Sequence, residues 1–151
     1  MSKDLTKNKS WCPIPWVTYS INSLGHYRLC VQANSYKSRN DRWRREFNMG
    51  KFTRGTLWKS HDPDEKDNAP LNCATTNLNE VRNNELLKDI REYMLRGERH
   101  PVCIRCNEED DTGIKSRRMA DRITMENNGF SIDDAFKHTK KDGTIPDTAK
   151  V

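Results

Sequence analysis

Cysteine is the residue type that most constrains this chain. Cys103 and Cys106 form a C-x-x-C pair, a spacing that lets both thiolates face one metal ion or cluster. Four ligands are needed to close a tetrahedral zinc site or to hold an iron–sulfur cluster by thiolates alone. The chain has five cysteines, and the other three are Cys12, Cys30 and Cys73. The sequence therefore carries enough thiols for one complete four-ligand site.

A predicted β-hairpin supplies the second pair of ligands. Apolar and polar residues alternate over 17–22 and again over 27–31, and the residues between them favour a turn. Cys12 lies just before the first strand and Cys30 near the end of the second, so the hairpin brings the two toward each other. Cys73 has neither hairpin nor C-x-x-C geometry. We expect it to be a small buried side chain, with substitution for one of the four ligands as the alternative.

The chain carries no sequence sign of secretion or membrane insertion. Its first ten residues are polar with no apolar stretch behind them, and no apolar run approaches the roughly 18 residues of a membrane span. We therefore expect a cytoplasmic protein with reduced cysteines, which favours metal ligation or redox chemistry over disulfides. A thioredoxin-like C-x-x-C follows a strand in a βαβ unit, whereas this one follows a predicted helix and Pro101, so that role is disfavoured.

The other regular elements are predicted to be helices, which gives an α+β fold of a small hairpin and helices around the cysteine site. Apolar spacing and caps favour helices over 77–97, where Asn84 is a second N-cap, and over 116–129. One or two more helical turns are predicted over 131–137. The two prolines within 13–15 are expected to hold the chain extended before the hairpin.

The apolar content is too low for a core of ordinary size. Leu, Ile, Val and Phe make up 26 of 151 residues, below the level of about 20% at which a chain becomes suspect for disorder. Ligation of a metal or cluster adds folding free energy that apolar burial does not supply here. We therefore expect a small metal-stabilised unit with flexible termini, including a disordered leader over 1–10.

An irregular basic insert is expected over about 35–76, with a short helix at 40–48. Between Arg28 and Lys59 the chain has nine Lys and Arg against two Asp and Glu. Aromatic residues are interleaved with these charges, as in proteins that stack single-stranded nucleic acid on aromatic rings: Tyr36, Trp43, Phe47, Phe52 and Trp58. Nucleic-acid binding through 35–59 is one hypothesis. A surface for a partner protein or substrate peptide, or a merely solvated face, are the alternatives.

Five motifs taken together resemble one known family. They are C-P-I-P-W at 12–16, I-R at 90–91, M-L-x-G-E at 94–98, P-x-C-x-x-C at 101–106 and G-x-x-S-x-R at 113–118. Over 11–35 and 77–120 the chain resembles the twitch-type, SPASM-related auxiliary-cluster domain of radical S-adenosylmethionine proteins. The resemblance implies a cluster-binding domain over 11–130 and an auxiliary [4Fe–4S] cluster whose ligands are Cys12, Cys30, Cys103 and Cys106.

The resemblance is to an accessory module and not to a whole enzyme. The motif that binds the catalytic cluster of radical enzymes, C-x-x-x-C-x-x-C, is absent from the sequence. Residues 142–146 resemble the segment after which the catalytic barrel of such enzymes begins, so 131–151 is expected to be a tail or a truncated linker to a missing catalytic domain. Asp110 stands where family members often carry Glu. The resemblance implies an electron-transfer or structural role, a catalytic radical domain or chain as partner, and no radical chemistry by this chain alone.

Zinc in place of the cluster is the main alternative. The same four cysteines would then form a structural binding module, because thiolates suit both metals. Acid–base catalysis has little support, since no histidine has a motif-defined partner. We expect His100 to be a surface residue, with a role beside the C-x-x-C pair as the alternative, and the acidic run 108–111 to be solvated. The sequence leaves open whether the chain is an enzyme.

Overall fold

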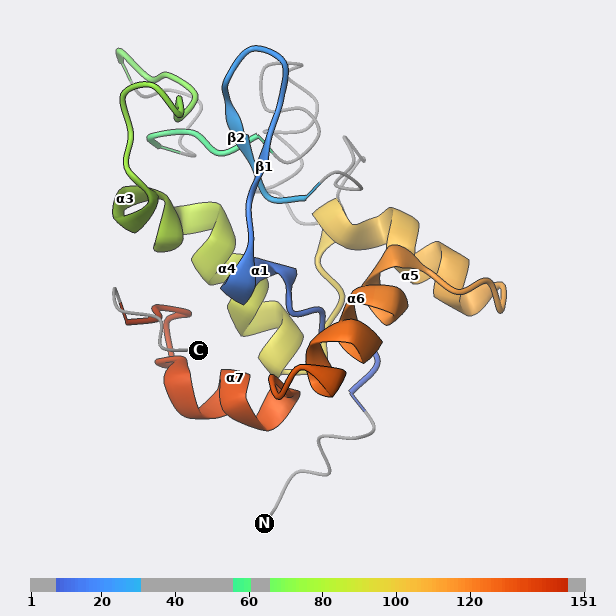
Figure 1. The fold of residues 1–151 in the computed structure, drawn as a ribbon. Coiled ribbons are helices and arrows are strands. Elements are labelled where there is room, and N and C mark those ends of the chain that lie inside the picture. The colour runs from blue at the N-terminus through green and yellow to red at the C-terminus, as the bar shows by residue number, and fades with distance from the viewer. Residues whose placement is uncertain (1–7, 31–55, 61–65, 147–151) are drawn as a thin grey trace.

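The computed structural model describes residues 8–30, 56–60 and 66–146 (Figure 1). Within these ranges the elements are, in chain order, α1 (Ile14–Val17), β1 (Ser20–Ile21), β2 (Tyr27–Arg28), α3 (Leu78–Arg82), α4 (Glu85–Leu95), the 3₁₀ turn η3 (Pro101–Cys103), α5 (Ile104–Asp111), α6 (Arg117–Asn127) and α7 (Ile132–His138). α4 runs through the middle of the molecule, with the hairpin toward one end, α7 toward the other, and α5 and α6 along one side. The predicted α+β class is confirmed.

The hairpin is shorter than the alternating sequence pattern predicts. β1 and β2 are antiparallel, with Ile21 opposite Tyr27. Both backbone groups of Tyr27 pair with other segments: its N–H donates to the carbonyl of Leu71 at 2.9 Å, and its carbonyl accepts from the N–H of Leu57 at 2.9 Å. All three of these side chains are buried. Residues from two later segments therefore complete the packing of the second strand.

The chain before the hairpin is a helical turn, so the prediction of an extended segment there is wrong. Pro13 is the N-cap of α1, with φ −70° and ψ −18°, and Pro15 lies in the first turn. Proline is compatible with these positions, because the first N–H groups of a helix have no intrahelical partner and the fixed φ of proline suits the helix. The turn buries Trp16, whose Nε1 donates to Thr139 Oγ1 at 2.8 Å.

The long helix predicted before the C-x-x-C pair is two helices, and both predicted N-caps are used. The Asn77 side chain accepts from the N–H of Glu80 at 3.0 Å and begins α3. The Asn84 side chain accepts from the N–H of Leu86 at 3.0 Å and begins α4. Gly97, with φ +77°, follows the end of α4 as predicted. One face of α4 enters the core through Leu86, Leu87, Ile90, Arg91 and Met94.

The helix predicted after the C-x-x-C pair is confirmed as α6. Its N-cap is Ser116, whose hydroxyl oxygen accepts from the N–H of Met119 at 3.1 Å. The further turns predicted beyond it form α7, which begins with a capping box of Ser131 and Asp134.

The segment expected to be a tail or linker contributes to the core over 131–146. Ile132, Ala135 and Ile145 are buried there. Asn83, between α3 and α4, donates to the carbonyl of Ile145 at 2.9 Å and accepts from its N–H at 3.0 Å. Two hydrogen bonds therefore join the end of this segment to the junction between α3 and α4.

The end of the expected disordered leader is also held against the fold. The Asn8 side chain donates to the carbonyl of Met94 at 2.7 Å, and Ser10 is buried. Residues 1–7, most of the basic insert, the predicted helix at 40–48 and most of the surface over 35–59 lie outside the described residues. Within the described part of the chain, no helix is long and apolar enough to cross a membrane.

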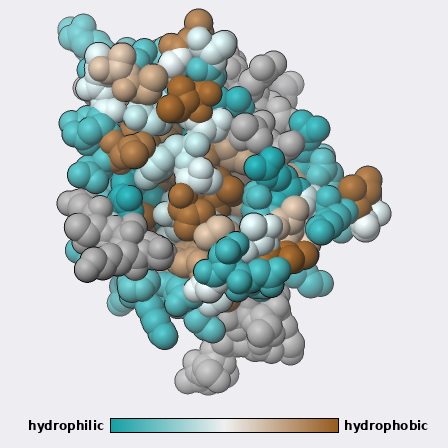
Figure 2. Space-filling model, viewed as in Figure 1, coloured by the Kyte–Doolittle hydropathy of each residue, from teal (hydrophilic) through white to brown (hydrophobic). Residues whose placement is uncertain are grey.

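Some large apolar side chains stay exposed. Figure 2 shows apolar groups among hydrophilic ones on one face of the molecule. The exposed residues of this type are Val17, Ile21, Leu24, Leu78, Ile114 and Ile123.

Candidate metal centre

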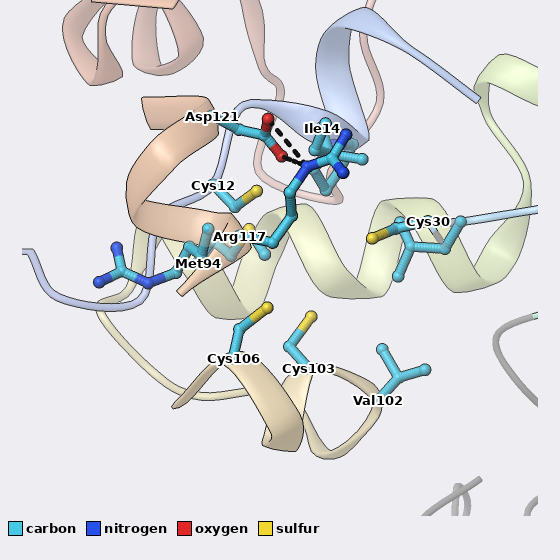
Figure 3. A pocket seen from close by; sticks show the side chains of 12 residues that line it. Cys12, Ile14, Cys30, Met94, Val102, Cys103, Cys106, Arg117 and Asp121 are labelled. Atoms are coloured by element: carbon cyan, nitrogen blue, oxygen red, sulfur yellow. Dashed lines mark hydrogen bonds and ion pairs between the residues drawn. The ribbon is translucent and has the colours of Figure 1, made fainter. Parts of the chain in front are cut away.

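Four cysteines line one cavity, and Figure 3 shows their sulfur atoms directed toward the same space. They are Cys12, Cys30, Cys103 and Cys106, the four that the sequence singles out. The cavity has a volume of about 30 Å³. Cys12 and Cys106 are buried, and the other two are half-buried. The rest of the lining is Ile14, Pro15, Leu29, Met94, Val102, Arg117, Arg118 and Asp121.

Three separate stretches of chain bring these thiols together. Cys12 lies just before α1, and Cys30 lies two residues after β2. Cys103 ends η3 and is the N-cap of α5, and Cys106 lies in the first turn of that helix. The C-x-x-C pair therefore begins a helix, but it follows α4 and a 3₁₀ turn, and not the strand that a thioredoxin-like motif requires.

Cys73 lies away from this cavity. Its side chain is exposed, so the expectation of a buried one is wrong. The N–H of Cys73 donates to the carbonyl of Gly25 at 2.8 Å, which places it beside the hairpin turn. Gly25 lies before the start of β2, whereas Cys30 lies beyond its end. As placed here, Cys73 is not positioned to replace one of the four thiols.

The four thiols surround a space rather than a point. Among the residues that the structure describes, no group of three or more His, Cys, Asp or Glu side chains is arranged to hold a single metal ion.

His100 positions the turn that carries the C-x-x-C pair. The expectation of a surface histidine is wrong, because its side chain is only 1% exposed. Its Nε2 lies 3.1 Å from Asp89 Oδ2, and its Nδ1 accepts from the N–H of Val102 at 3.2 Å. This pattern assigns the ring proton to Nε2, which donates to Asp89. The histidine thus links Asp89 of α4 to Val102 of η3, and Val102 is the residue before Cys103.

Arg118 joins the two sides of the site. Its Nη1 donates to the carbonyl of Trp11 at 3.0 Å, and its Nε donates to Asp110 Oδ2 at 2.8 Å. The backbone N–H of Arg118 also donates to the thiol of Cys106. One residue of α6 therefore contacts the segment before Cys12, the helix of the C-x-x-C pair and a sulfur atom.

The acidic run after the C-x-x-C pair is engaged in ion pairs, and not simply solvated. Asp110 pairs with the buried Arg118 at 2.7 Å. Asp111 pairs with Arg99 at 2.6 Å on the surface, and this contact lowers the pKa of the Asp111 carboxyl. Asp110 therefore has a structural role, because it links α5 to Arg118 of α6.

Burial raises the pKa of three of the four thiols. Loss of water is the largest cause for Cys12, and the neighbouring Cys30, Asp121 and Cys106 raise its pKa further. Burial and then the other three thiols raise the pKa of Cys103 well above its usual range. The pKa of Cys106 is raised mainly by burial as well. At neutral pH these three thiols are therefore neutral in the absence of a ligand, and binding of a metal or cluster to them displaces protons.

Two backbone N–H groups favour the thiolate forms. The N–H of Ile14 lowers the pKa of Cys12, and the N–H of Arg118 lowers that of Cys106. Hydrogen bonds of this kind to ligating sulfur atoms are among the features that set the reduction potential of an iron–sulfur cluster.

Sequence reasoning missed Met94, Arg117 and Asp121 as lining residues. One signal was available: Arg117 and Asp121 lie four residues apart at the start of a predicted helix, a spacing that favours an ion pair. Nothing local indicates that this pair faces the cysteines.

Comparison of the chain with protein-family models, with curated proteins and with solved structures returned no match.

Proposed function

We propose that this chain is an iron–sulfur accessory module that holds a [4Fe–4S] cluster through Cys12, Cys30, Cys103 and Cys106. The observation that carries the proposal is that these four thiols, from three separate stretches of chain, line one cavity. Four thiolates are the ligand set of such a cluster. A single zinc ion would need all four sulfur atoms about 2.3 Å from one point, and among the described residues no group of side chains is arranged in that way.

The residues present fit the charge and hydrogen-bonding needs of such a group. The backbone N–H groups of Ile14 and Arg118 donate to two of the sulfur atoms. Arg117 and Arg118 place cationic side chains among the lining residues. Met94 and Val102 are buried at the cavity and limit the access of water. When bound, a cluster with four thiolate ligands supplies one-electron redox chemistry or structural support, because it has no open iron for a substrate.

We propose a catalytic radical domain or chain, or a peptide substrate of such an enzyme, as the partner. The proposal follows from the motif resemblance and from the absence of C-x-x-x-C-x-x-C in the sequence. This chain's own contribution is then to bind the cluster and to orient it through the three stretches of chain that carry the four thiols.

Anaerobic reconstitution with iron and sulfide tests the proposal. The loaded protein is expected to be brown, with iron and acid-labile sulfide in the proportion of one [4Fe–4S] cluster per chain. Cys103→Ser and Cys106→Ser should abolish incorporation, because each removes one of four ligands. Cys30→Ala, at a half-buried position, provides a variant with less effect on folding. A colourless protein that binds one zinc ion with the same four cysteines would show the alternative structural module.

Cys73→Ser is the matched control for these variants. Its side chain is exposed and lies away from the cavity, so iron content and visible absorption should match those of the unmodified protein. Equal loss in Cys73→Ser and Cys103→Ser would mean that the ligand set is wrong.

A further inference from the structure

One ion pair within a single helix lines the cysteine cavity. In the first turns of α6, Arg117 Nε donates to both carboxylate oxygens of Asp121, to Oδ2 at 2.9 Å and to Oδ1 at 3.1 Å (Figure 3). The side chain of Arg117 is 49% exposed and that of Asp121 is 19% exposed. Arg118, by contrast, is 3% exposed and bonds to both Trp11 and Asp110. Arg117 and Asp121 are therefore the charges at the cavity that can be altered with the least structural damage.

Both charges interact electrostatically with the thiols. The hydrogen bond to Asp121 is the largest cause of the raised pKa of Arg117, and electrostatic interactions with Cys30 and Cys12 raise it further. Asp121 in turn contributes to the raised pKa of Cys12. In Figure 3 the Arg117 side chain is drawn between Cys12 and Cys30 in this view, with its Nε facing Asp121. The pair is therefore close enough to act on a charge held by these cysteines.

We propose that Arg117 and Asp121 set the reduction potential of the cluster in opposite directions. This inference rests on the proposed function. A [4Fe–4S] core with four thiolate ligands carries a net negative charge, and reduction by one electron makes that charge more negative. A guanidinium at the cavity stabilises the reduced form, and a carboxylate there stabilises the oxidised form. Net charge near a cluster is one of the main determinants of its potential, and the effect is strengthened where water is excluded.

The experiment is an equilibrium redox titration of the anaerobically loaded protein, with dithionite as the reductant and visible absorption as the readout. Arg117→Gln is expected to move the midpoint potential to more negative values, because it removes the cation and leaves Asp121 without its partner. Asp121→Asn is expected to move the potential to more positive values. Arg117→Lys keeps the charge and should stay closer to the unmodified protein than Arg117→Gln does.

The control is a second ion pair that does not line the cavity. Arg96 and Glu98 are 3.0 Å apart beyond the end of α4, with side chains 49% and 55% exposed. Arg96→Gln and Glu98→Gln change the net charge by the same amounts as Arg117→Gln and Asp121→Asn. Their shifts should be smaller, since water and salt screen charges on the open surface.

The outcomes separate this inference from the function on which it rests. If the unmodified protein takes up no iron and sulfide, the proposed function fails. If it loads normally, but Arg117→Gln and Asp121→Asn shift the potential in the same direction or by no more than the control pair, only the tuning role fails. If Arg117→Gln does not load, Asp121→Asn still tests the inference, because a potential that fails to move to more positive values in this variant would contradict it.

Discussion

One glycine allows the C-terminal segment to pack against α4. Gly143 has φ +86°, and a Cβ built at this position would lie 2.0 Å from the carbonyl oxygen of Lys88. The carbonyl of Gly143 also accepts from Nη1 of Arg91 at 3.1 Å, and this arginine is fully buried. Its Nε donates to the carbonyl of Pro15 at 2.9 Å. Arg91 therefore ties the C-terminal segment to α1 through backbone carbonyls, and burial lowers the pKa of this guanidinium to about 10.

We expect Gly143→Ala to destabilise the protein by about 2–4 kcal/mol, because the added carbon clashes with backbone and the left-handed φ is strained for alanine. Gly113→Ala is the matched control, with φ +80° and no atom within 4 Å of the added carbon. It should cost only the strain of about 1–2 kcal/mol. Urea denaturation followed by circular dichroism measures both. Equal losses of stability in the two variants would show that the clash with the Lys88 carbonyl adds nothing to the cost of Gly143→Ala.

The elements that sequence predicts correctly are those with local causes. The side chains that cap α3, α4 and α6 lie two or three residues from the N–H groups they bind. These caps can therefore be predicted from the local sequence. The C-x-x-C spacing likewise accounts for the pairing of Cys103 and Cys106, whereas α1 separates Cys12 from the hairpin predicted to bring it toward Cys30. The roles of Arg118 and His100 have no such local cause. Arg118 bonds to a carbonyl 107 residues earlier in the chain, and His100 to a carboxylate on α4.

The N-caps of α3 and α4 should differ in their contribution to stability. The Asn84 side chain caps α4 and also donates to the carbonyl of Trp58 at 2.7 Å, and the residue is buried. Asn77 caps α3 through one exposed hydrogen bond. We expect Asn84→Ala to cost about 2 kcal/mol, since it removes two hydrogen bonds made by a buried side chain, and Asn77→Ala about 0.5–1 kcal/mol.

Denaturant titration of both variants checks this order. A loss in Asn77→Ala as large as that in Asn84→Ala would contradict the assignment, because it would mean that the link between α4 and the segment at 56–60 contributes little.

Across the whole molecule, the apolar core and the thiol cavity are adjacent. Cys12 belongs to the buried cluster that includes Trp11, Trp16 and the apolar face of α4, and Cys30 and Cys103 pack against it. The limited apolar content is thus concentrated where the four thiols meet. Loading of the site should therefore stabilise the whole fold, because a group that binds only the native arrangement shifts the unfolding equilibrium.

The pH dependence of stability should differ between the ligand-free and loaded forms. Without a ligand, the raised pKa values of Cys12, Cys103 and Cys106 mean that the unfolded chain loses these protons first as the pH rises. Their contribution to stability is fully present below about pH 8.5 and is lost above it. In the loaded form the sulfur atoms are already deprotonated, and protons bind on unfolding. Its stability should instead rise with pH up to about pH 8.5.

Anaerobic guanidinium denaturation across this range measures both slopes, with loss of visible absorption reporting on the loaded form. In the ligand-free protein, Cys12→Ala should remove part of the alkaline loss of stability, because one buried thiol no longer resists ionisation. Cys73→Ala should leave the loss unchanged, since that thiol is exposed and lies away from the cavity. A ligand-free protein whose stability is flat from about pH 8 to pH 10 would show that the thiols ionise as freely in the fold as in the unfolded chain.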